Sequence, residues 1–84
     1  MYIVVGSITM ATRLSRVIEK NTGLPTKVVH TPSALREGGC SYSVYTSDKI
    51  YDIVHTILSD FDIHVKGIYI EKLVDGEREY RDIS

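Results

Sequence analysis

The residue with the most distinctive chemistry in this sequence is Cys40, the only cysteine of the chain. It follows Gly38 and Gly39, whose missing side chains leave the backbone open to close approach by a ligand or a partner. The thiolate is the nucleophilic form of cysteine, and a helix N-terminus or a nearby cation lowers the thiol pKa and so favours it. Unpaired cysteines are also among the most deeply buried residues, so inert packing is the alternative interpretation.

The three histidines do not indicate a second chemical centre. His30 is expected at the end of a strand, and His55 and His64 are expected on the surface. Their spacing around Cys40 matches no zinc-binding pattern. The sequence also shows no Ser-His-Asp arrangement, no pair of carboxylates suited to acid–base catalysis and no glycine-rich phosphate loop. We therefore expect no metal, no cofactor and no enzymatic activity beyond, at most, a thiol-transfer intermediate.

Length and composition limit the class of protein. The 84 residues are expected to form one domain, 1–84, with its core in about 2–70 and a hairpin or tail in 71–84. So small a domain buries only about 60% of its unfolded surface, which favours a homodimer. The net charge of −1 disfavours nucleic acid and anionic membranes as partners. The apolar start lacks a basic leader and is too short to be a signal peptide or a membrane span, so a cytoplasmic location is expected, where a thiol stays reduced.

The first half of the sequence predicts a strand, a helix and a second strand. The opening residues are β-branched or aromatic and stop at Gly6-Ser7, which predicts a short buried strand. Ser7 or Thr9 offers a helix N-cap, and apolar residues at helical spacing predict a helix over about 9–21. Residues 26–30 are rich in β-formers and predict the second strand.

The second half predicts a loop, a strand, a helix and a hairpin. Residues 33–39 are expected to be a loop, followed by a third strand around 42–44 and a helix capped by Ser47-Asp48. The apolar stripe predicted for that helix comprises Ile50, Ile53, Val54, Ile57, Leu58 and Phe61. A fourth strand is expected over 64–74, and Asp75-Gly76 predicts a two-residue hairpin turn. The mostly charged segment that follows would form an edge strand, a partner contact or a tail.

The order of these elements predicts an α+β fold, a ferredoxin-like βαββαβ two-layer sandwich with a C-terminal hairpin extension. In that topology the third strand lies between the first two and runs antiparallel to both. The start of the third strand, with Cys40, would therefore lie at the same end of the sheet as Gly6-Ser7 and His30-Thr31-Pro32. The first helix also begins there, and its positive dipole end would stabilise a thiolate.

Several segments in this order resemble a bacterial family, the selenium/sulfur-carrier-like (Se/S carrier-like) domains. The likeness spans about 2–70 and rests on four segments, which are Gly6-Ser7-Ile8-Thr9-Met10-Ala11, Thr22-Gly23-Leu24, Thr31-Pro32-Ser33 and Gly39-Cys40-Ser41-Tyr42-Ser43. The resemblance implies that Cys40 takes up sulfur or selenium as a persulfide or perselenide. It also implies protein partners, a donor and an acceptor of that atom, with Gly6-Ser7 and Thr31-Pro32 shaping the surroundings of the thiol. Together with the predicted topology, this gives as expected binding residues around Cys40 the set Gly6, Ser7, Thr9, His30, Pro32, Gly38, Gly39 and Ser41.

The sequence departs from the family pattern at two positions beside the expected site. Ser41 stands where a glycine usually follows the cysteine, which restricts the backbone next to the sulfur. Ser33 stands where an arginine often follows the proline, which removes a cation that could hold the thiolate. A member of the family that no longer carries sulfur or selenium is therefore an alternative.

Two further functions remain open at this point. In the first, the chain is a non-enzymatic binding or regulatory module that acts through dimerisation, Cys40 is structural, and residues 71–84 are the first candidate interface. In the second, which the net charge disfavours, an aromatic sheet face with Tyr42 and Tyr69 binds nucleic acid.

Overall fold

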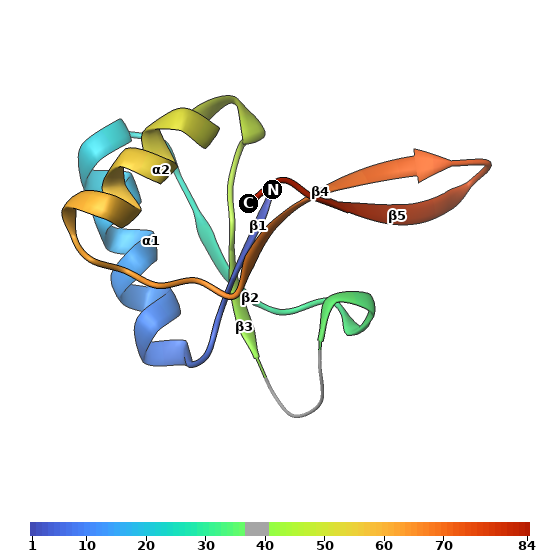
Figure 1. The fold of residues 1–84 in the computed structure, drawn as a ribbon, viewed down its shortest axis with the longest axis horizontal. Coiled ribbons are helices and arrows are strands. Elements are labelled where there is room, and N and C mark those ends of the chain that lie inside the picture. Colours follow the sequence, from blue (N-terminus) through green and yellow to red (C-terminus); the bar gives the residue numbers. More distant parts are fainter. Residues whose placement is uncertain (37–40) are drawn as a thin grey trace.

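The computed structural model describes residues 1–36 and 41–84 of the chain and has an α+β architecture. One antiparallel sheet of five strands is covered on one face by two helices (Figure 1). In chain order the elements are β1 (Tyr2–Val5), α1 (Ile8–Thr22), β2 (Lys27–His30), the 3-10 helix η1 (Ser33–Leu35), β3 (Tyr42–Tyr45), the 3-10 helix η2 (Asp48–Ile50), α2 (Tyr51–Asp60), β4 (Gly67–Val74) and β5 (Glu77–Asp82).

The sheet has the strand order β2-β3-β1-β4-β5, and every neighbouring pair is antiparallel. The predicted insertion of β3 between β1 and β2 is therefore confirmed. The predicted turn is also confirmed, since Asp75 and Gly76 both have positive φ, at 52° and 80°. The charged segment that follows this turn pairs with β4 along its whole length, which adds a fifth strand to the four of the expected core.

The core lies between the helices and the sheet face that they cover. The buried side chains of α1 recur at helical spacing and pack against alternate residues of β1, β3 and β4. The residues of this core that are least exposed are Ile3, Val5, Ala11, Leu14, Ile18, Val44, Val54 and Ile68. The apolar periodicity of the first helix therefore gave the correct buried face.

The second helix differs from its prediction in its start and in its buried stripe. Ser47 caps a turn of 3-10 helix rather than α2, because its side chain accepts a hydrogen bond from the Lys49 amide. Two residues of the predicted stripe are exposed, Ile53 at 47% and Phe61 at 42%. Ile53 lies one residue, about 100° around the helix, before the buried Val54, and Phe61 lies beyond the last helical residue.

Other elements also differ in their bounds from the sequence prediction. The first helix begins at Ile8, because Ser7 and not Thr9 is its N-cap, and it extends to Thr22. The segment predicted as a loop contains η1. The fourth strand begins at Gly67 rather than at His64, because the chain is still crossing from the helix layer at Ile63, which is buried in the core.

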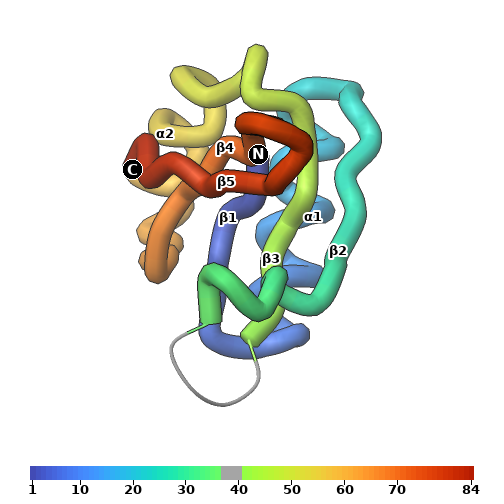
Figure 2. Tube along the Cα trace, turned by 90° about the vertical axis from the view of Figure 1, so that its right-hand side faces the viewer, coloured from blue at the N-terminus to red at the C-terminus, as the bar shows by residue number. Residues whose placement is uncertain are grey.

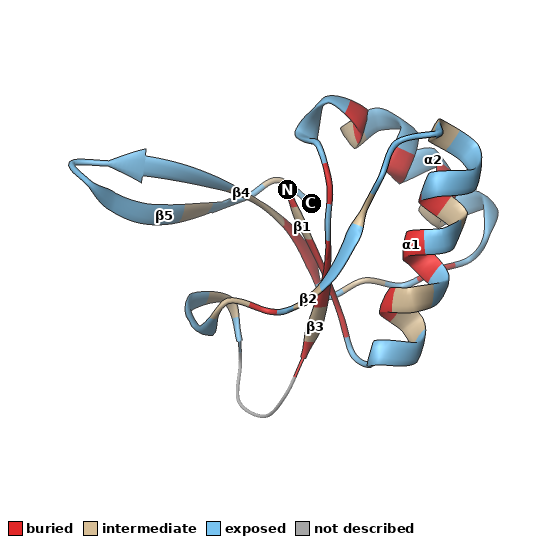
Figure 3. Ribbon diagram, turned by 180° about the vertical axis from the view of Figure 1, so that it is seen from behind, coloured by how far each residue is buried: buried red, intermediate tan, exposed pale blue. Residues whose placement is uncertain are grey.

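The β4–β5 hairpin and η1 both lie on the side of the sheet away from the helices (Figures 1 and 2). Most of the hairpin is exposed (Figure 3). The alternation of side chains along the strands places Tyr42 toward the helices and Tyr69 on the opposite face, so these two tyrosines form no joint aromatic surface. Neither helix in the described part of the chain is long and apolar enough to cross a membrane.

Candidate functional site

The strand register brings three segments to one end of the sheet. Val5 at the end of β1 and His30 at the end of β2 both lie opposite Tyr42 at the start of β3. Gly6-Ser7 directly follows Val5, and Thr31-Pro32 directly follows His30. Both segments therefore lie at the end of the sheet where β3 begins. This is the convergence of segments that the sequence predicted.

Cys40, together with Gly38 and Gly39, lies outside the described residues, so its position at this end stays a prediction. Its covalent neighbour Ser41 is described, and only 5% of Ser41 is exposed. The Ser41 carbonyl accepts a hydrogen bond of 3.1 Å from the Thr31 amide, which continues the β2–β3 pairing one step past His30. The chain on the Ser41 side of the cysteine is thus held firmly against the end of β2.

Three buried hydroxyls line this end of the sheet on the face away from the helices. The hydroxyls of Thr31 and Ser43 are hydrogen-bonded at 2.8 Å, and these residues are 2% and 0% exposed. Ser41 lies two residues before Ser43, on the same face, and its buried Oγ has no hydrogen-bond partner among the described residues. An unsatisfied buried hydroxyl costs on the order of 1–3 kcal/mol, so a donor or acceptor that reaches Ser41 would be favoured.

The N-terminus of α1 supplies unpaired backbone donors at the same end. Ser7 has an extended backbone and accepts a hydrogen bond of 3.1 Å from the Met10 amide, as an N-cap does. The amides of Ile8 and the exposed Thr9 have no such partner among the described residues. No acidic side chain lies in the first turn, so the positive end of the helix dipole is not neutralised locally.

A lysine, Lys66, also lies here. A Cβ built on Gly6 would stand 3.8 Å from Cε of Lys66, and the Lys66 amide donates to the carbonyl of Val4 at 2.7 Å. The exposed Lys66 side chain therefore adds a cation beside Gly6. The 3.8 Å contact is ordinary, so Gly6 itself is not required for steric reasons. No sequence signal could have indicated Lys66, because its proximity arises from the contact of β1 with the segment that leads into β4, which is far away in the chain.

His30 is separated from the three hydroxyls by the sheet. Its exposed ring lies 4.9 Å from the ring of Tyr42, which is on the helix side. Pro32 precedes η1 and turns the chain out of β2, with φ of −52°. Among residues 1–36 and 41–84, no three His, Cys, Asp or Glu side chains come together as metal ligands.

Ser43 is a second residue of this end that the sequence analysis did not use as a site. The available signal was a polar residue in the middle of a short strand, between Tyr42 and Val44. Such a position is more often polar because it faces solvent, whereas here it is fully buried and paired with Thr31.

Comparison with known proteins assigns the chain to a family. The family described as "Putative Se/S carrier protein-like" matches residues 1–70 of the 84, and the chain therefore belongs to this family. The match includes Cys40 and all of β1, β2 and β3, whereas the hairpin from Glu71 onward lies beyond it. Curated proteins and solved structures give no match to the chain.

Proposed function

We propose that this member of the Se/S carrier-like family carries sulfur or selenium on Cys40 and passes it to a partner protein. The observation that carries the proposal is the family match over residues 1–70, which includes the only cysteine. On this proposal the chain is a carrier rather than an enzyme and works with two protein partners, a donor and an acceptor. The strand order supports a ferredoxin-like sandwich, with β5 added next to β4.

The transfer step needs only a thiolate and a persulfide or perselenide donor. The Cys40 thiolate attacks the terminal sulfur of a donor persulfide, a new S–S bond forms at Cys40, and the bond in the donor breaks. The donor leaves as a thiolate, so no external oxidant or reductant is consumed. A second exchange of the same kind with an acceptor thiolate returns Cys40 to its starting state.

The geometry at this end of the sheet favours a thiolate. The amides of Ile8 and Thr9 and the positive dipole end of α1 stabilise an anion, and the Lys66 ammonium adds to this effect. Lys66 also supplies a positive charge although Ser33 replaces the arginine of the family pattern. Ser41, to which Cys40 is bonded, pairs with Thr31 at this same end of the sheet, which supports a position of the thiol near these groups.

The test is transfer to the full-length chain from a cysteine desulfurase supplied with free cysteine. Intact-protein mass spectrometry is expected to show a gain of one sulfur atom, which a reductant removes and which Cys40→Ser abolishes. The Cys40 pKa, measured from the ultraviolet absorbance of the thiolate, is expected below the free value of about 8.5.

A matched control moves the thiol to an exposed position on α2. In Cys40→Ser combined with Ser59→Cys, the only cysteine lies in the last turn of α2, where the helix dipole disfavours a thiolate. This variant is expected to have a higher thiol pKa and to accept little sulfur. Equal loading of the two proteins, or a Cys40 pKa at or above about 8.5 with no persulfide formed, would refute the carrier function.

A further inference from the structure

β5 is the longer of the two edge strands of the sheet, with six residues against the four of β2. β5 is the last strand of the sheet and pairs only with β4 on its inner side. Five of its six residues are exposed, and it runs Glu77-Arg78-Glu79-Tyr80-Arg81-Asp82. Edge strands with free N–H and C=O groups readily pair with another strand unless something prevents it.

The hydrogen bonds of the hairpin show which residues of β5 point outward. The Ile83 amide donates to the Ile68 carbonyl at 2.8 Å, which makes these two residues a hydrogen-bonded pair in the β4–β5 register. Hydrogen-bonded and non-hydrogen-bonded pairs alternate along an antiparallel ladder. Arg81, Glu79 and Glu77 therefore use their backbone groups toward β4. The N–H and C=O groups of Arg78, Tyr80 and Asp82 point to the open edge.

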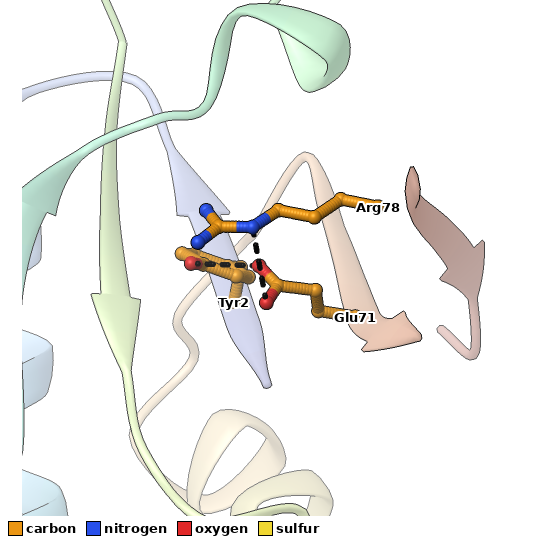
Figure 4. A network of polar contacts seen from close by, with 3 residues as sticks. All are labelled: Tyr2, Glu71 and Arg78. Carbon is orange, nitrogen blue, oxygen red and sulfur yellow. Dashed lines mark hydrogen bonds and ion pairs between the residues drawn. The ribbon is translucent and has the colours of Figure 1, made fainter. Parts of the chain in front are cut away.

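Polar contacts brace the hairpin against the body of the sheet (Figure 4). The hydroxyl of Tyr2 donates to Oε2 of Glu71 at 3.3 Å, and Nε of Arg78 lies 3.9 Å from Oε1 of the same carboxylate. The ring of Tyr80 packs edge-on against Tyr2, with centroids 5.8 Å apart. These contacts support the pairing of β5 with β4, and a strand that is ordered before it binds loses less entropy on binding.

The charges of β5 are complementary to a second copy in one antiparallel register. When two β5 strands pair about Tyr80, Glu79 lies opposite the partner's Arg81, and Arg78 lies opposite the partner's Asp82. The two-fold symmetry repeats both pairs, so four pairs of opposite charge face each other across the edge. The same register places Arg78, Tyr80 and Asp82, the three residues with outward backbone groups, in hydrogen-bonded pairs.

The neighbouring registers that preserve this backbone pairing are electrostatically worse. Moving the centre of the strand pair from Tyr80 to Glu79 makes Glu79 face the partner's Glu79. Moving the centre from Tyr80 to Arg81 makes Arg81 face the partner's Arg81. Directly opposed like charges destabilise a strand pair, so the sequence of β5 selects the register centred on Tyr80.

We infer that two copies of this chain associate through antiparallel pairing of their β5 strands about Tyr80, which joins the two sheets into one. Charged residues usually protect an edge strand from pairing, but here the two signs alternate so that a second copy satisfies both. This inference rests on the hairpin alone and does not depend on the function proposed for Cys40.

The test uses two single charge reversals in the full-length chain. Glu79→Arg creates two Arg–Arg pairs in its own dimer, and Arg81→Glu creates two Glu–Glu pairs. Each variant alone is expected to dimerise at least roughly tenfold more weakly than the parent by sedimentation or light scattering. A mixture of the two restores both opposite-charge pairs and is expected to form a 1:1 heterodimer, which native mass spectrometry distinguishes from either homodimer.

Glu77→Arg is the matched control for the register. It makes the same change of charge in the same strand, but residue 77 lies opposite the partner's Ile83, so parent-like dimerisation is expected. Circular dichroism of each variant checks folding, and the heterodimer itself requires both variants to be folded. A parent chain that stays monomeric up to its solubility limit, or a mixture that gives no heterodimer, would overturn the inference. Loss of the dimer in Glu77→Arg would overturn the register.

Discussion

The hydrogen bond between the buried hydroxyls of Thr31 and Ser43 predicts a strong energetic coupling at the candidate site. Thr31→Val keeps the shape of the side chain but leaves the Ser43 hydroxyl, which is 0% exposed, without this partner. An orphaned buried hydroxyl costs about 1–3 kcal/mol of unfolding free energy, and Ser43→Ala orphans Thr31 in the same way. In a domain of this size, each 1 kcal/mol lowers Tm by roughly 4–8 °C.

The double variant separates the hydrogen bond from the other effects of each substitution. When both hydroxyls are removed, no polar group of the pair is left unsatisfied, so the double variant is expected to lose no more stability than either single variant. Urea unfolding, followed by circular dichroism, should therefore give a coupling energy of about 1–3 kcal/mol. Thr9→Val, at an exposed position, is the control and should change stability by no more than about 0.5 kcal/mol. Single-variant losses that simply add, within about 0.5 kcal/mol, would refute this account of the pair.

Two further predictions concern the start of α1 and the base of the hairpin. Ser7→Ala removes the N-cap and is expected to lower the free energy of unfolding by about 1 kcal/mol, measured with urea. Ser7→Asp can still cap the helix and should retain most of that stability. Equal losses in both variants would contradict the capping role. Burial and the neighbouring Glu71 carboxylate raise the pKa of Tyr2, so the stabilisation linked to its neutral phenol is present below about pH 10 and is lost as the pH rises through the raised pKa. Glu71→Gln should lower the Tyr2 pKa in a tyrosinate absorbance titration read as the difference from Tyr2→Phe, and an unchanged value would argue against the contact.

Local patterns in the sequence were sufficient where a single physical requirement determined the structure. Asp75-Gly76 predicted the hairpin because both turn positions need positive φ, which these residues adopt at low cost. The spacing of Ala11, Leu14, Val17 and Ile18 predicted the face of α1 that packs on the sheet, where Val17 is only partly buried. In both cases the local residue pattern was enough to predict the structure.

The sequence prediction of buried residues in α2 was wrong where the tertiary structure decided which of two equally apolar residues is buried. Ile53 fitted the helical stripe as well as Val54 did, but the orientation of α2 on the sheet buries Val54 and leaves Ile53 exposed. For the site, the strand order predicted that Gly6-Ser7 and Thr31-Pro32 start at one end with β3. It did not predict Lys66 beside Gly6, because that contact depends on the pairing of β1 with the segment that leads into β4.

The strand register separates the β4–β5 hairpin from the end of the sheet where Cys40 is predicted to lie. Gly67 of β4 pairs with Val4, near the end where Gly6-Ser7 and the start of β3 lie, and Tyr69 pairs with Tyr2 at the other end. The hairpin continues beyond Tyr2, about 10 Å from Val5 at the strand spacing of about 3.3 Å per residue. The β5 edge is therefore separate from the end of the sheet where Cys40 is predicted to lie. It follows that Cys40→Ser should leave the dimer unchanged and that Glu79→Arg should leave sulfur loading unchanged, so either proposal can fail without the other. A loss of sulfur loading in folded Glu79→Arg would contradict this separation.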